Sequence, residues 1–225
     1  MERKTPLFVH IIGLEGCGHH GLYPVMGQAI VETHGGDEFN RFYRSGLRNA
    51  FDGIWCRNYS KRDCIRGALH FLEKVPRDTI ILEDNSYPSG KYREVQHQWD
   101  FVEFYDFLKE HCEIRFALLN RNIFNLVNSR REFDDGLKAH ALKMAEIGNF
   151  INERISALEA KGVPVTRLDY DFLESQTAEI GALIDCPAEA VDTAMKEQFK
   201  KSTKDYRETL SDQEIQDVKD AFDIN

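Results

Sequence analysis

The chain has 225 residues, of which 42% are hydrophobic and 30% charged, with 15 Gly and 6 Pro. This composition is typical of a globular protein and excludes a collagen-like or wholly disordered chain. The formal net charge of −9 excludes a general nucleic-acid binder, because binding to phosphate backbones needs a basic face.

Four short segments are nearly all apolar, which is typical of strands buried on both faces of a parallel sheet. In chain order they are Leu7–Gly13, Thr79–Glu83, Ile114–Leu119 and Pro164–Leu168. His10 lies inside the first of them. We expect it to be a core histidine whose ring nitrogens are hydrogen-bonded.

Between and after these strands, apolar residues recur at helical spacing. The predicted helices span residues 19–33, 61–75, 94–111, 122–132, 137–161, 187–200 and 212–222. Ser211 and Glu214 form a capping box at the start of the last helix. The alternation predicts a single domain over residues 1–225, with an α/β, P-loop-type, three-layer fold in which helices flank a central, mainly parallel sheet.

The first apolar segment, Leu7–Leu14, is far shorter than the roughly 18 residues that a membrane span requires. It follows Glu2, Arg3 and Lys4 and has no small-residue cleavage site behind it. The five cysteines are scattered and form no C-x-x-C pair, so neither a disulfide framework nor a structural zinc site is indicated. We expect a cytoplasmic protein with no membrane partner.

The segment from His34 to Ser60 lacks clean periodicity and predicts a long irregular insertion, a feature that is more often functional than decorative. Between Arg41 and Arg66 there are seven Lys and Arg against two Asp, a local net charge of +5 in an acidic chain. Such a segment is either a solvated helix face or a surface that faces an anion.

The first strand leads into a glycine-rich turn and then a helical pattern. Gly13 and Gly18 have the G-x-x-x-x-G spacing of phosphate-binding loops, in which backbone N–H groups converge on an anion at a helix N-terminus. The Lys and Ser/Thr of magnesium-dependent nucleotidases are replaced by His19 and His20, which disfavours such an enzyme. Adjacent helical histidines do not easily share one ion, so we expect an anion site and no metal site.

The third strand leads into Arg121, which is followed by Asn122 and, eight residues after the arginine, by Ser129. This element resembles the sulfotransferase family that uses 3′-phosphoadenosine 5′-phosphosulfate (PAPS), in which such an arginine and serine hold the 3′-phosphate. The glycine-rich loop stands where the family has its 5′-phosphosulfate loop. Residues 168–173 are similar to the family's Tyr-Glu-Asp-Leu element, and residues 199–207 to its basic C-terminal segment.

The resemblance implies transfer of a sulfuryl group from PAPS to a hydroxyl or amine of a small-molecule or glycan acceptor, without a metal. It assigns Arg121 and Ser129 to the 3′-phosphate, and Lys200 and Lys201 to a segment that closes over PAPS. The residues that would hold the 5′-phosphosulfate are Gly16, Cys17, Gly18, His19, His20 and Gly21.

Gly16 departs from the family pattern, because a lysine or arginine normally stands there to neutralise the leaving phosphate. Three explanations follow: His19 and His20 supply the charge, the arginine-rich segment supplies it, or the protein binds without catalysing. The acceptor also needs a base within hydrogen-bond reach of its proton. The candidate bases are Glu38, Glu83, Asp84 and His20.

Two other functions remain open at the level of sequence. One is a P-loop nucleotide kinase or NTPase, which would need magnesium ligands that the loop lacks. The other is a non-catalytic module that binds adenosine 3′,5′-bisphosphate. A comparison of the affinities for this nucleotide and for ATP with magnesium distinguishes a kinase or NTPase from a sulfotransferase. An assay of sulfuryl transfer distinguishes a non-catalytic module from an active enzyme.

Overall fold

The computed structural model describes residues 5–35, 44–88, 94–129, 136–202 and 205–224. Among these residues the centre is a four-stranded sheet in which all neighbours are parallel and the order is β2-β1-β3-β4. The strands are β1 (Leu7–Leu14), β2 (Ile80–Tyr87), β3 (Glu113–Asn120) and β4 (Val165–Asp169). The predicted α/β architecture is confirmed.

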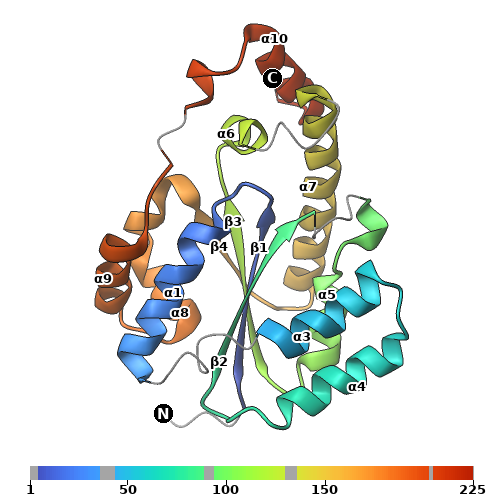
Figure 1. Ribbon diagram of the computed structural model, residues 1–225, viewed down its shortest axis with the longest axis vertical. Helices are drawn as coiled ribbons and strands as arrows, with labels where there is room; N and C mark the ends of the chain where they lie inside the picture. The colour runs from blue at the N-terminus through green and yellow to red at the C-terminus, as the bar shows by residue number, and fades with distance from the viewer. Residues whose placement is uncertain (1–4, 36–43, 89–93, 130–135, 203–204, 225) are drawn as a thin grey trace.

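Helices cover both faces of this sheet (Figure 1). α1, α8 and α9 lie on one face, α3, α4 and α5 lie on the other, and α6 and α10 lie near the carboxyl ends of the strands. The bounds are α1 (His19–His34), α3 (Arg44–Phe51), α4 (Lys61–Leu72), α5 (Phe101–Leu108), α6 (Ile123–Asn128), α7 (Leu137–Ala160), α8 (Thr177–Ile184), α9 (Ala188–Gln198) and α10 (Asp212–Ala221). None of these helices is both long enough and apolar enough to cross a membrane.

β1 shows why the sheet is covered on both sides. Leu7 and Val9 belong to the core layer that includes α1, and Phe8 and Ile12 belong to the opposite layer. All four side chains are fully buried. Because successive side chains of a strand point to opposite faces, the continuous apolar run of β1 requires helices on each side.

The second strand is longer than predicted. β2 continues to Tyr87, and its polar residues Asp84 and Asn85 pair in register with Ile11 and Ile12 of β1. Backbone pairing therefore extends the strand where side-chain polarity predicted its end. As a result, Asp84 lies within a strand rather than just after one.

The segment 34–60 is not irregular throughout, because it contains α3 and the π-helical turn Asp52–Cys56. The predicted helix 94–111 is interrupted: α5 begins only at Phe101, where the Asp100 side chain accepts hydrogen bonds from two backbone N–H groups of the first turn. α8 was not among the predicted helices. The capping box of Ser211 and Glu214 at the start of α10 is confirmed.

His10 is fully buried in an aromatic environment that includes Trp99, Phe101 and Phe104. Neither of its ring nitrogens has a hydrogen-bond partner among the described residues, so the expectation of a hydrogen-bonded histidine is wrong. Burial lowers the pKa of His10 to about 3, and the nearby charges of His19 and Arg48 act in the same direction. His10 is therefore neutral in the folded protein.

This burial predicts that the protein loses stability in mild acid. The pKa of His10 is about 3 in the folded protein and ~6.5 in the unfolded chain, so the unfolded state binds more protons between these values. The free energy of unfolding should fall as pH falls below ~6.5, with a slope of up to about 1.4 kcal/mol per pH unit from this residue. Urea unfolding at about pH 7 and about pH 5 measures this change. Between these two pH values, the free energy of unfolding should fall less in His10→Leu than in the wild type. An identical loss in both proteins would contradict the assignment.

Candidate anion-binding site

The loop between β1 and α1 depends on two glycines. Gly16 and Gly18 have φ angles of 95° and 96°, in the left-handed region that favours glycine. A Cβ on Gly16 would lie 2.5 Å from Ser129 Oγ, and one on Gly18 would lie 2.2 Å from ring atoms of Tyr170. The loop is therefore packed against distant parts of the chain so closely that neither position has room for a side chain.

The loop ends at the N-terminus of α1. Gly18 is the N-cap residue of α1, and no side chain among the described residues caps this end of the helix. Backbone N–H groups in the first turn carry partial positive charge, and the helix dipole adds to it. The local geometry is thus compatible with the anion site that the glycine spacing predicts.

Arg121 connects the end of β3 to the loop. Its Nη1 donates a hydrogen bond to the Gly16 carbonyl at 2.8 Å, and its guanidinium carbon lies 4.5 Å from the centroid of the Tyr170 ring. The Tyr170 hydroxyl accepts a hydrogen bond from the Ser202 N–H at 2.9 Å. The buried Nε–H of Arg121 has no acceptor among the described residues. Arg121 is therefore held beside the loop by these contacts.

Ser129 lies directly after α6, as its C-cap residue. Its hydroxyl donates to the Leu126 carbonyl at 2.7 Å and retains lone pairs that can accept a further hydrogen bond. The same hydroxyl lies close to Gly16, because it is the atom that a Cβ on that glycine would meet first. Arg121 and Ser129 thus both adjoin the loop.

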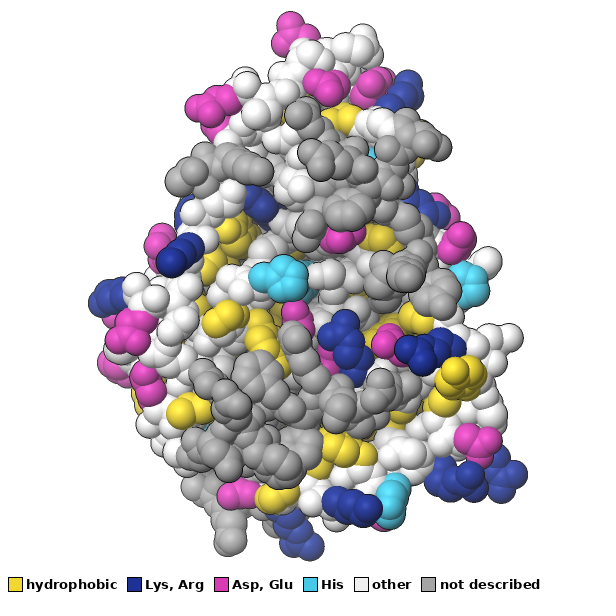
Figure 2. All heavy atoms as spheres, in the orientation of Figure 1, with side chains coloured by type: hydrophobic (Ala, Val, Ile, Leu, Met, Phe, Trp, Pro, Cys, Tyr) yellow, Lys and Arg dark blue, Asp and Glu magenta, His cyan; other side chains and the backbone are white. Residues whose placement is uncertain are grey.

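A cavity of about 450 Å³ lies beside the loop, within the size range of small-molecule sites. Residues from the loop, α1, α3 and β2, together with Arg121 and Ser129, form its wall. They are Glu15, Gly16, Gly18, His19, His20, Arg48, Asp84, Asn85, Ser86, Pro88, Arg121 and Ser129. In Figure 2, acidic and basic side chains of the described residues are interspersed over the visible face of the molecule.

The two histidines at the start of α1 differ in environment. His19 is 2% exposed, its Nδ1 lies 3.1 Å from Ser86 Oγ, and burial lowers its pKa to about 4, although the charge of Asp84 opposes that shift. A neutral His19 cannot supply the missing positive charge near pH 7. His20 is exposed at the cavity wall. The described His, Cys, Asp and Glu residues form no group of three or more that could hold a metal ion.

Cys17 and Gly21 belong to the predicted set but do not line the cavity. The Cys17 N–H donates to the Leu14 carbonyl at 3.1 Å, and burial raises the pKa of its thiol to about 12. The Gly21 N–H donates to the Gly18 carbonyl at 2.9 Å. Both backbone donors are therefore used within the loop and the first turn of α1.

Lys200 and Lys201 also lie outside the cavity wall. The Nζ of Lys201 donates to the Asp171 carbonyl.

Of the candidate bases, Asp84 and His20 line the cavity, and Glu83 bonds to Arg48 instead. Glu38 lies outside the described residues. Arg48, which sequence reasoning placed only in a basic segment, is brought to the cavity by α3.

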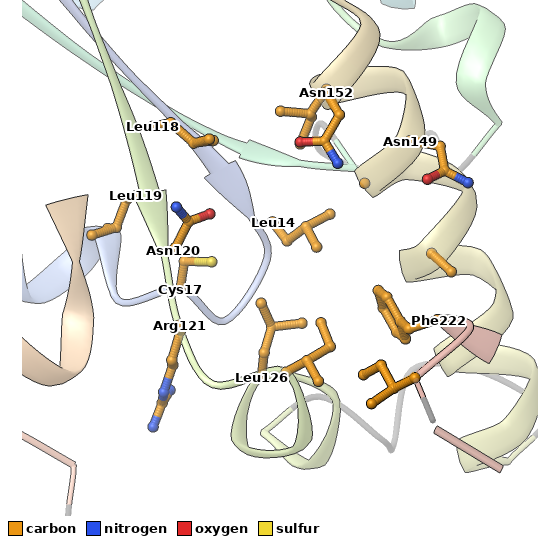
Figure 3. A pocket seen from close by; sticks show the side chains of 15 residues that line it. Leu14, Cys17, Leu118, Leu119, Asn120, Arg121, Leu126, Asn149, Asn152 and Phe222 are labelled. Atoms are coloured by element: carbon orange, nitrogen blue, oxygen red, sulfur yellow. The ribbon is translucent and has the colours of Figure 1, made fainter. Parts of the chain in front are cut away.

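A second, more apolar pocket of about 280 Å³ lies between the end of β1, α6, α7 and the C-terminal residues (Figure 3). Leu14, Leu126 and Phe222 approach one another across it, whereas the guanidinium of Arg121 points away. The Cys17 side chain also belongs to its lining. The charge of Arg121 is therefore directed away from this pocket, and its hydrogen bond and ring contact lie at the loop and Tyr170.

No protein-family model matches this chain, and no curated protein matches it. Among solved structures the chain is similar to the "Sulfotransferase Domain from the Synechococcus PCC 7002 Olefin Synthase". The sequence identity is 12% and the TM-score 0.42, over 96% of this chain and 85% of that chain. The architecture and the site described above stand on the geometry of this chain itself.

Gly16 and Gly67 provide a matched pair of substitutions that test the packing of the loop. Gly16→Ala should lower the free energy of unfolding by about 1–3 kcal/mol, because a left-handed residue gains a Cβ that overlaps Ser129. Gly67 lies inside α4, and a Cβ there meets nothing within 4 Å, so Gly67→Ala should raise it by about 0.5–1 kcal/mol. Urea unfolding measures both changes. A Gly16→Ala variant as stable as the wild type would show that the loop is not packed in this way.

Proposed function

We propose that this protein is a sulfotransferase that moves the sulfuryl group of PAPS to a hydroxyl or amine of a small-molecule or glycan acceptor. One observation supports this function above all others. Arg121 and Ser129, an arginine and a serine spaced as in the family that uses PAPS, lie against a glycine loop at a helix N-terminus and line the same cavity. This arrangement supports a ligand that carries two phosphate groups.

The 3′-phosphate is assigned to Arg121 and Ser129. A guanidinium presents several N–H donors in a planar fork, and charge-assisted hydrogen bonds to phosphate are stronger than neutral ones. The hydrogen bond to Gly16 and the contact with the Tyr170 ring hold that fork in place before a ligand arrives. Prior fixation lowers the entropy lost on binding.

The 5′-phosphosulfate is assigned to the loop and the first turn of α1. In the reaction, the acceptor oxygen or nitrogen attacks sulfur in line as the bond from sulfur to the phosphate oxygen breaks. The electron pair of that bond leaves with adenosine 3′,5′-bisphosphate, and the acceptor's proton passes to a base. Asp84 is the favoured base, because this residue lines the cavity and is 7% exposed. His20 is the second candidate.

The role of Arg121 predicts a selective loss of affinity. Arg121→Met should weaken binding of adenosine 3′,5′-bisphosphate by about 10- to 150-fold, which corresponds to the ~1.5–3 kcal/mol of a hydrogen bond to a charged group. Binding of AMP, which lacks the 3′-phosphate, should change much less. Isothermal titration calorimetry measures both. Arg167→Met is the matched control, because Arg167 forms an exposed ion pair with Glu159 at 2.7 Å and does not line the cavity.

The same titrations, together with a sulfuryl-transfer assay, distinguish the alternative functions. Wild-type protein that binds ATP with magnesium in preference to adenosine 3′,5′-bisphosphate would favour a P-loop kinase or NTPase. Tight binding of the bisphosphate without sulfuryl transfer to any of a panel of phenols, sugars and amines would favour a non-catalytic module. An Arg121→Met variant that keeps the wild-type preference for the bisphosphate over AMP would contradict the assignment of the 3′-phosphate.

A further inference from the structure

Position 16 of the loop is a glycine and not a lysine or arginine that could contact the leaving phosphate. The packing around Gly16 explains why. Gly16 has a positive φ, and a Cβ there would lie 2.5 Å from Ser129 Oγ and 3.1 Å from the Leu126 carbonyl oxygen. A lysine or arginine at position 16 would therefore require the Ser129 side chain and the C-terminal end of α6 to shift. Because negative charge develops on the phosphate as the sulfuryl group leaves, a positive group from elsewhere in the cavity is required.

Among the described residues, two arginines line the cavity, Arg48 and Arg121. Arg48 comes from α3, its side chain is 40% exposed, and its Nη1 bonds to Glu83 Oε1 at 3.1 Å. Glu83 lies on β2, and its side chain is only 1% exposed. A buried carboxylate is costly unless it is paired, so Glu83 holds one N–H of Arg48 and leaves the rest of the guanidinium available to the cavity.

The strand order places the two arginines on opposite sides of the loop. β1, which carries the loop, lies between β2 and β3 in the sheet. Arg48 is bonded to Glu83 of β2, and Arg121 follows β3 directly. Asp84 and Ser86, which belong to the same strand as Glu83, also line the cavity. A ligand that spans the loop therefore has one arginine near each end.

We propose that Arg48, held in place by Glu83, is the cation that contacts the 5′-phosphosulfate group and takes the role of the absent loop lysine. This inference rests on the proposed function and adds two residues to it. Arg48 contacts the ligand, and Glu83 is a positioning residue that acts through Arg48. A guanidinium suits this arrangement better than an ammonium, because its planar fork can bond to a carboxylate and to a phosphate at the same time.

Three adenosine nucleotides separate the roles of the two arginines. Arg48→Met should weaken binding of 5′-AMP and of adenosine 3′,5′-bisphosphate by about 10- to 100-fold and leave 3′-AMP nearly unchanged. Arg121→Met should weaken 3′-AMP and the bisphosphate and leave 5′-AMP nearly unchanged. The matched control is Arg154→Met. Arg154 is 34% exposed, pairs with Asp100 at 3.2 Å and does not line the cavity, so its loss tests the effect of removing a half-buried ion pair alone.

Turnover provides a second measurement. The assay uses PAPS and an acceptor that the wild-type protein sulfates. Arg48→Met should lower kcat by more than it raises the KM for PAPS, because the positive charge matters most when the phosphate departs. Arg48→Lys should recover part of the kcat. Glu83→Gln should reduce kcat in the wild-type background and have little further effect in Arg48→Met, since Glu83 acts through Arg48. If Arg48→Met does not fold, Arg48→Lys and Glu83→Gln provide the test instead. Each of them should also lower kcat by more than it raises KM.

The outcomes separate the inference from the proposed function. Wild-type protein that binds none of the three nucleotides would overturn the proposed function. Wild-type protein that binds them, with Arg48→Met binding 5′-AMP as tightly as the Arg154→Met control, would overturn the inference alone. An equal loss for 5′-AMP and 3′-AMP in Arg48→Met would also overturn it, because a general loss of structure does not distinguish the two ends of the ligand.

Discussion

The hydrogen bond from Arg121 to the Gly16 carbonyl joins the end of β3 to the loop that follows β1. The geometry of the site depends on this connection. The ring of Tyr170 contacts the guanidinium and also fills the space next to Gly18. Since the carboxyl ends of parallel strands meet at one edge of the sheet, a single side chain can reach the loop from the neighbouring strand.

The charges of the site are arranged around this connection. The chain is acidic overall, yet its cavity has a fixed arginine on either side of the loop. Each guanidinium is held by a specific acceptor, the Gly16 carbonyl for Arg121 and the Glu83 carboxylate for Arg48. Positive groups held by local partners can bind an anion although the rest of the surface is not basic. Such a site suits a small charged ligand rather than a polyanion.

Much of the fold could be predicted from local sequence. The continuous apolar run of β1 and the helical spacing after it predict a strand and a helix whose bounds agree with the structure within one residue. The family resemblance assigns Arg121 and Ser129 to one phosphate; in the structure both adjoin the loop, and their joint role stays a prediction. Strand-to-helix order is encoded in nearby residues, so reasoning from periodicity succeeds there.

Features that depend on tertiary contacts could not be predicted. β2 extends through Asp84 and Asn85 because β1 pairs with them, although polar residues alone suggest the end of a strand. The ion pair of Arg48 and Glu83 joins a helix to a strand 35 positions away in sequence, and charge counting identified only the basic segment. The neutral state of His19 follows from burial beneath the loop, which its position in the sequence does not reveal.

The burial of Cys17 has a consequence for the chemical reactivity of the protein. Oxidants and electrophiles attack the thiolate form of cysteine, and burial keeps the Cys17 thiol protonated, with a pKa raised to about 12. Four of the five cysteines, Cys17 among them, are buried, and Cys64 of α4 is the most accessible. Alkylating reagents should therefore reach Cys64 first, so that a spectroscopic label can be attached to α4 before the loop that carries Cys17 is modified.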